Sequence, residues 1–87
     1  MAGLSAGKIR ILLFAGLREQ AGWAEQQWPA APQPDSVLTP RQLWLKLHLP
    51  GALDQQVRVA INQQFADADT PLQPGDELAF LPPISGG

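Results

Sequence analysis

The residue types that could carry chemistry in this chain point to its C-terminus. The 87 residues include no cysteine and a single histidine, His48, which excludes disulfides, thiolate metal sites and Cys–His catalytic pairs. We expect His48 in the last turn of a helix, where a protonated imidazole complements the helix dipole. The chain ends in Gly86-Gly87, and no side chain on these two residues shields the terminal carboxylate of Gly87. That carboxylate is therefore open to activation or attack.

The remaining polar residues form no recognisable catalytic or metal-binding pattern. Asp67 and Asp69 lack the further spaced oxygens and the closing glutamate of a calcium loop, so they are predicted to be solvated turn residues. Ser5, Ser36 and Ser85 have no nearby base and do not lie in a nucleophile-elbow pattern. We predict no metal site, no permanently bound cofactor and no active site within the chain itself.

The composition narrows the choice of partners and compartment. Six basic and eight acidic residues give a net charge of −2 and a pI near 5.0, which argues against nucleic-acid binding. The apolar stretch at residues 11–17 is too short to span a bilayer, and no signal-cleavage pattern follows it. The sequence therefore predicts a cytoplasmic protein that binds neither membrane nor nucleic acid.

Residues 82–87 are predicted to leave the fold as a flexible tail. Pro82 and Pro83 cannot donate to a strand ladder, so they end the last strand. The segment reaches roughly 20 Å when extended, and its two glycines can pass through a channel too narrow for a Cβ atom. A frayed end without function is the alternative, because chain termini often hold small residues. After the two prolines the tail consists of Ile84, Ser85, Gly86 and Gly87.

A single domain must position this tail, because a chain of this length holds one modest core. Residues 1–7 are predicted to be a loose leader, and residues 8–81 the folded domain. The predicted elements are, in order, a strand at 8–14, a helix at 15–21 closed by Gly22, an edge strand at 23–28, a proline-rich loop at 29–36, a helix from Thr39 stopped by Pro50-Gly51, and strands at 57–62, 65–66 and 77–81. Mixed strands with one main helix predict an α+β fold, with the helix covering one face of a mixed sheet. A ubiquitin-like β-grasp satisfies this order.

Strand alternation also predicts an apolar surface on the uncovered face of the sheet. If the larger alternating set faces the helix, then Phe14, Ala60 and Leu81 face outward, and Phe65 joins them. An exposed apolar patch with aromatic residues usually marks an interface. The alternative is that another loop covers it. Trp44 is assigned to the core or its margin. The set predicted to face the helix is Ile11, Leu13, Val57, Val59, Ile61, Leu78 and Phe80.

From residue 8 onward the chain resembles the small subunit of molybdopterin synthase, within the family of ubiquitin-like sulfur carriers. The most specific match is the ending Pro-Pro-Ile-Ser-Gly-Gly at 82–87. Further matches are Ile-Leu-Leu-Phe-Ala at 11–15, Leu-Arg-Glu at 17–19, Val-Ala-Ile-Asn-Gln at 59–63, Pro-Leu at 71–72 and Gly-Asp-Glu-Leu-Ala-Phe at 75–80. The leader and the proline-rich loop before Thr39 depart from the usual pattern.

The resemblance implies a β-grasp fold and a sulfur carrier whose working group is Gly87. An ATP-dependent activating enzyme would adenylate the carboxylate, leaving a transient acyl-AMP, and a sulfur donor would convert it to a thiocarboxylate. The large subunit would use that sulfur for the dithiolene of molybdopterin, in a heterotetramer. The resemblance also supports an interface role for Phe14, Phe65 and Leu81, and adds Arg18 as their polar neighbour.

Two alternative functions stay open at this point. The first is a related sulfur carrier that serves thiamine or another sulfur-requiring pathway, with the same chemistry and a different acceptor. The second is a ubiquitin-like modifier, in which Gly87 forms an amide with a lysine. Lys8 and Lys46 are the only lysines of the chain, so self-conjugation would have few acceptor sites.

Overall fold

The computed structural model describes residues 7–29, 38–51, 53 and 56–82. Residues 1–6 of the predicted leader, most of the proline-rich loop and residues 83–87 of the predicted tail lie outside this part. The described elements are β1 (Lys8–Leu13), α1 (Ala15–Ala21), β2 (Glu25–Pro29), α2 (Pro40–Lys46), β3 (Arg58–Ile61), β4 (Gln64–Ala66) and β5 (Glu77–Leu81). The order matches the prediction, although the strand predicted at 23–28 begins two residues later and includes Pro29.

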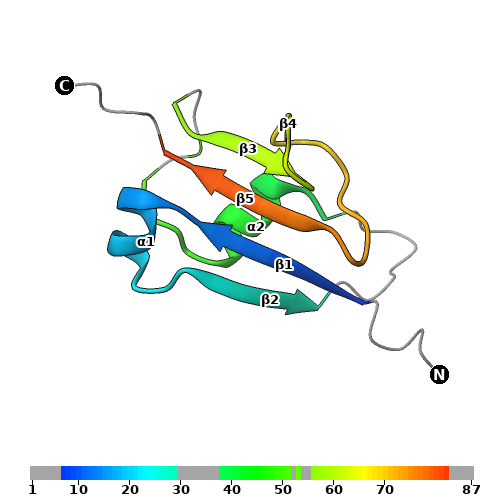
Figure 1. The fold of residues 1–87 in the computed structure, drawn as a ribbon, viewed down its shortest axis with the longest axis horizontal. Coiled ribbons are helices and arrows are strands. Elements are labelled where there is room, and N and C mark those ends of the chain that lie inside the picture. The colour runs from blue at the N-terminus through cyan, green and yellow to red at the C-terminus, as the bar shows by residue number, and fades with distance from the viewer. Residues whose placement is uncertain (1–6, 30–37, 52, 54–55, 83–87) are drawn as a thin grey trace.

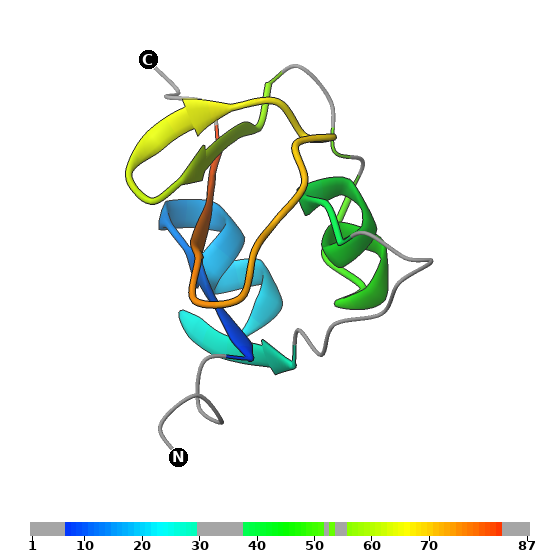
Figure 2. The same cartoon turned by 90° about the vertical axis from the view of Figure 1, so that its right-hand side faces the viewer.

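The strands form one mixed sheet in the order β2-β1-β5-β3-β4. β1 and β5 are parallel, whereas the other neighbouring strands are antiparallel. β2 lies at an edge of the sheet, which explains how it tolerates Pro29. Figures 1 and 2 show α2 on one side of the sheet, behind β1 and β5 in the first view. The architecture is the predicted ubiquitin-like β-grasp.

The face of the sheet that α2 covers holds the core. Alternate residues of β1 and β5 point into it, and each is at most 2% exposed. From α2, Leu43 and Trp44 fill the space above them. The Trp44 ring meets Phe80 edge-on with centroids 5.1 Å apart, and its Nε1 donates to the carbonyl of Gly51 at 3.0 Å. Trp44 is therefore a core residue, as predicted. The alternate strand residues are Ile9, Ile11, Leu13, Leu78 and Phe80.

α1 is anchored by one buried leucine and closed by a glycine. Leu17 is the buried residue of this short helix. Gly22 follows in the left-handed conformation with φ 84°, and its N–H donates to the carbonyl of Arg18. A residue with a Cβ would be strained there. The predicted glycine cap is confirmed, and it turns the chain directly into β2.

The N-terminus of α2 follows its sequence signal. The Thr39 hydroxyl accepts a hydrogen bond from the backbone N–H of Gln42 at 3.2 Å, with Pro40 in the first helical turn. Such a cap satisfies one of the free N–H groups at a helix start. Leu43 lies in the core, and Leu38, just before the cap, packs against it.

The C-terminus of α2 differs from the prediction. The helix ends at Lys46, before Pro50-Gly51, and His48 lies beyond it with φ 55°. The His48 N–H donates to Leu45, and the Leu49 N–H donates to Trp44. This is a Schellman motif with histidine in the left-handed position that glycine usually takes. The prediction that His48 lies in the last helical turn is therefore wrong, because the helix ends at Lys46 and His48 is itself the left-handed residue at which the chain turns away.

A two-residue turn joins β3 to β4 and holds the start of β5. Asn62 and Gln63 both have positive φ, 53° and 70°, as a type I′ hairpin requires. The Asn62 side chain donates to Asp76 at 2.9 Å and accepts from the Glu77 N–H at 3.0 Å. These bonds fix the register between the hairpin and β5.

Candidate functional site

β5 brings the chain to the point where the predicted tail begins. Leu81 is its last residue and pairs with Arg58 of β3. Pro82 follows, half-buried and outside the strand. The tail residues Pro83, Ile84, Ser85, Gly86 and Gly87 lie outside the described part of the structure, so their roles stay predictions. The described surface next to the start of the predicted tail is the sheet around this exit point.

Apolar side chains on the outer face of the sheet lie closest to the exit point. Phe14 follows β1 and is 42% exposed, whereas Phe65 on β4 is 68% exposed. Leu81 and Leu12 are half-buried. Leu12 is aligned with Ala79, Ala79 with Ala60, and Ala60 with Phe65 across four neighbouring strands. We call the surface formed by Leu12, Phe14, Phe65 and Leu81 the exit patch.

Ala60 was predicted to be part of the exposed apolar patch, but it adds almost no exposed area to it. It lies on the outer face, but it is only 8% exposed, and its neighbour Ala79 is 7% exposed. Neither belongs to the cluster packed under α2. Their methyl groups are shorter than the side chains around them, so these taller neighbours shield both. The two alanines form a flat floor between Leu12 and Phe65.

Arg58 is a feature of this face that the sequence analysis did not assign. It is exposed, and its guanidinium carbon lies 5.2 Å from the centre of the Phe65 ring. This is a cation–π distance. The alternation of β3 could have placed Arg58 on the outer face. The contact with Phe65 depends on the Ala60–Phe65 pairing, which only the structure shows.

Arg18, the predicted polar neighbour of the patch, lies exposed in the last turn of α1. A positive charge there complements the helix dipole. Within the described part of the chain no ion pair involves its side chain. The structure thus keeps this guanidinium available, but its role in an interface stays a prediction.

The other end of the outer face is polar and internally paired. The Nε of Arg10 donates to Glu25 at 2.8 Å, and a guanidinium nitrogen lies 3.8 Å from Glu77. The hydrogen bond and the charge of Glu25 raise the pKa of Arg10 above its usual value. The outer face therefore divides into the exit patch, near the end of β5, and a salt-bridged end beyond it.

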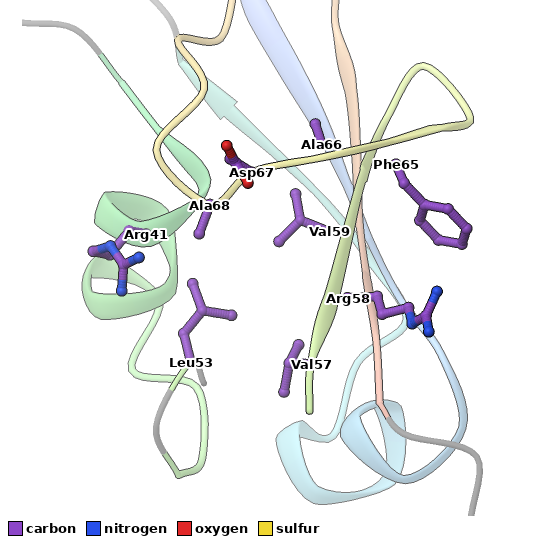
Figure 3. Close-up of a pocket in the computed structure, with 9 residues that line it drawn as sticks. All are labelled: Arg41, Leu53, Val57, Arg58, Val59, Phe65, Ala66, Asp67 and Ala68. Carbon is purple, nitrogen blue, oxygen red and sulfur yellow. The ribbon is translucent and has the colours of Figure 1, made fainter. Parts of the chain in front are cut away.

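A cavity of about 350 Å³ lies between α2 and the β3–β4 hairpin. Leu53, Val57, Val59 and Ala68 supply its apolar wall. Figure 3 shows these side chains on one side of β3, whereas the Arg58 guanidinium and the Phe65 ring extend away on the other. Arg58 and Phe65 also line the cavity, so it borders the exit patch at Phe65.

The described residues offer neither a metal centre nor a membrane span. No group of three or more histidine, aspartate or glutamate residues gathers among them. Asp69, one of the predicted turn residues, is exposed and pairs with Arg41 at 2.8 Å. None of the helices found in this part of the chain has the length and apolarity needed to cross a bilayer.

Comparison with known proteins gives a consistent family. Residues 11–87 match the ThiS family. The human molybdopterin synthase sulfur carrier subunit is 34% identical over 92% of this chain and 94% of its own length. The corresponding subunit of Escherichia coli is 38% identical over 91% of this chain and 99% of its own length. Among solved structures, SAMP1 from Haloferax volcanii superposes with a TM-score of 0.70 at 29% identity, covering 93% of this chain and all of that one.

Proposed function

The chain belongs to the ThiS family and is related over most of its length to sulfur carrier subunits of molybdopterin synthase, and from this premise we propose that it carries sulfur on Gly87. The sulfur would be held as a C-terminal thiocarboxylate and donated to the dithiolene of molybdopterin. The observation that carries the proposal is the Gly86-Gly87 ending, which follows a central strand that delivers the chain beside an exposed apolar patch.

Activation of Gly87 requires a partner enzyme, because an ionised carboxylate with a pKa of about 3.5 is a poor electrophile. A carboxylate oxygen would attack the α-phosphorus of ATP, giving an acyl-adenylate and releasing pyrophosphate. Sulfide-level sulfur from a donor would then attack the acyl carbon, expel AMP and leave the thiocarboxylate. The cytoplasm supplies the ATP for this step. The chain contributes delivery and docking, while its partners contribute the oriented catalytic groups.

The exit patch is proposed as the surface that docks on the large subunit of molybdopterin synthase, within the heterotetramer. Phe14, Phe65 and Leu81 would be the apolar anchors, and Arg18 their polar neighbour. Support comes from position: Leu81 is the last strand residue before the tail. A partner that binds this patch would hold the tail within reach of its own active site. Aromatic side chains surrounded by smaller apolar ones are common anchors of such interfaces.

Removal of Gly87 tests the carrier function. We expect the truncated chain, and a Gly86→Val variant, to fold normally but to support no molybdopterin formation with the purified large subunit. Thermal unfolding followed by circular dichroism checks the fold. Intact mass checks whether oxygen is exchanged for sulfur at the C-terminus after incubation with ATP, the activating enzyme and a sulfur donor. Sulfur transfer by the truncated chain would overturn the proposal.

A ubiquitin-like modifier is the second candidate function, favoured by the likeness to SAMP1, which is described as a small archaeal modifier protein in a related structure. The two functions differ in the final bond at Gly87. A modifier forms stable amides with lysines of other proteins, whereas a carrier forms a thiocarboxylate. A carrier for thiamine or another pathway would form the thiocarboxylate as well, and co-purification of its acceptor enzyme from the native cell extract distinguishes it.

A further inference from the structure

We propose that Arg58, held against Phe65, is a specificity-determining contact of the exit patch and selects a protein partner that presents a carboxylate beside an apolar surface. The inference rests on the proposed docking function and adds to it a residue and a charge requirement. It concerns the side of the patch formed by β3 and β4, where Arg58 lies opposite Leu81 and its guanidinium stands 5.2 Å from the Phe65 ring centre.

A partner that binds the tail would also contact Arg58, because of where this residue lies. Its aligned neighbour Leu81 is the last residue of β5, so the side chain stands beside the exit point of the chain. Phe65 is 68% exposed, and both side chains extend away from the helix-covered side of β3 (Figure 3). A surface that covers Leu81 and Phe65 would therefore also cover Arg58.

Arg58 lacks the paired carboxylate that two other arginines have in the described part of the chain. Arg10 pairs with Glu25 and Arg41 with Asp69, each at 2.8 Å. Within the described part of the chain, no carboxylate pairs with Arg58. The protein as a whole is acidic, with a net charge of −2, yet among the described residues the proposed interface carries a positive charge without a paired carboxylate at Arg58, as it does at Arg18.

The requirement for a carboxylate follows from burial. Covering a cation without a counter-charge is unfavourable, so a partner that only offered apolar groups would be penalised. The Phe65 ring contacts the guanidinium, and a guanidinium presents several N–H donors in a fixed fork that suits a carboxylate. The apolar surroundings of Leu81 and Phe65 favour a protein surface as the source of that carboxylate.

The test compares charge changes at Arg58 and Arg41. Arg58→Glu and Arg41→Glu alter the net charge equally, and Arg41 is an exposed arginine on α2, outside the exit patch. Binding to the purified large subunit of molybdopterin synthase is measured by calorimetry at low and high salt. We expect Arg58→Glu to weaken binding about 30-fold or more, as burial of a mismatched charge does, and Arg41→Glu to leave it within about threefold.

Arg58→Met removes the charge but keeps an apolar side chain over Phe65. It therefore separates the effect of the charge on binding from the effect of lost packing. We expect it to bind about tenfold more weakly than the unaltered chain, with a flatter dependence on salt. Equal binding by Arg58→Glu and the unaltered chain would overturn the inference and leave the proposed function standing. Failure of the unaltered chain to bind the large subunit would overturn the proposed docking function, and this inference with it.

Discussion

Phe80 and Leu81 are neighbours in β5, yet they belong to opposite faces of the sheet and have opposite surroundings. Phe80 is fully buried against Trp44, whereas Leu81 is half-buried on the outer face, opposite Arg58. The inner face uses large apolar side chains that exclude water. The outer face has two alanines, a few larger apolar groups near the end of β5, and ion pairs beyond them. Strand alternation thus separates the residues that form the core from those proposed to bind a partner.

The largest effect should come from the inner face. Phe80→Ala removes a fully buried ring and its contact with Trp44, which should lower the free energy of unfolding by about 3–5 kcal/mol. Leu81→Ala, one residue along, should cost about 1 kcal/mol or less, because the side chain is half-exposed. Urea unfolding of both variants measures the difference. Similar losses at the two positions would show that the faces are not separated as described.

The next effect is on binding and compares two equally exposed residues. Phe65 in the exit patch and Leu45 on α2 are each 68% exposed. Phe65→Asp should weaken binding to the large subunit about 30-fold, the cost of losing an interface anchor. Leu45→Asp should leave binding unchanged.

Thermal unfolding serves as the control for this pair. Surface substitutions of this kind usually change stability by about 0.5 kcal/mol or less, and Phe65→Asp should lose roughly a further 0.5–1 kcal/mol with its cation–π contact. A binding loss at Leu45 as large as that at Phe65 would place the interface on the helix layer instead of the outer face.

Strand parity and capping chemistry were readable from the sequence because they depend on local spacing. The alternation at residues 9–13 and 78–80 identified the inner face, and Thr39 and Gly22 marked a helix start and a helix end. The element order then gave the β-grasp fold. Strand alternation and helix caps are each determined by residues that are only a few positions apart in the sequence.

Other features required the assembled structure. The burial of Ala60 depends on neighbours from two other strands, and the contact of Arg58 with Phe65 depends on the hairpin register. The end of α2 was misplaced because Pro50-Gly51 is a strong stop signal, whereas His48 is an unusual residue for the left-handed position. The roles of Gly86 and Gly87 rest on the sequence and the family.

A smaller change in stability is expected at His48, which follows α2, the helix that covers the inner face. At φ 55° a histidine is strained by its Cβ, so His48→Gly should raise the free energy of unfolding by about 0.5 kcal/mol. Gly22→Ala is the reverse experiment, since Gly22 has φ 84° at the end of α1, and it should destabilise by about 1 kcal/mol. Urea unfolding measures both. Destabilisation by His48→Gly would indicate that the imidazole makes a contact worth more than the strain.

The smallest effect concerns exposed ion pairs, and it bears on whether the polar end of the outer face is structural. Arg41 and Asp69 form such a pair at 2.8 Å on the helix layer, as Arg10 and Glu25 do on the outer face. The hydrogen bond from Arg41 and its positive charge lower the pKa of Asp69 below 3.8. Both partners are at least half exposed, so the pair should add little to stability.

The pH dependence of the Asp69 pair has a definite sign. Because its pKa is lower in the folded chain, the stabilisation is present above pH 3.8 and is lost as the pH falls through the folded value. Unaltered protein and Asp69→Asn should thus differ slightly at neutral pH and converge in acid. An NMR titration should find the pKa of Asp69 below its usual value, and Arg41→Met should return it there. A large difference in unfolding free energy at pH 7 would mean that exposed pairs do stabilise this fold, and the polar end of the outer face would then share the structural role now assigned to the inner face alone.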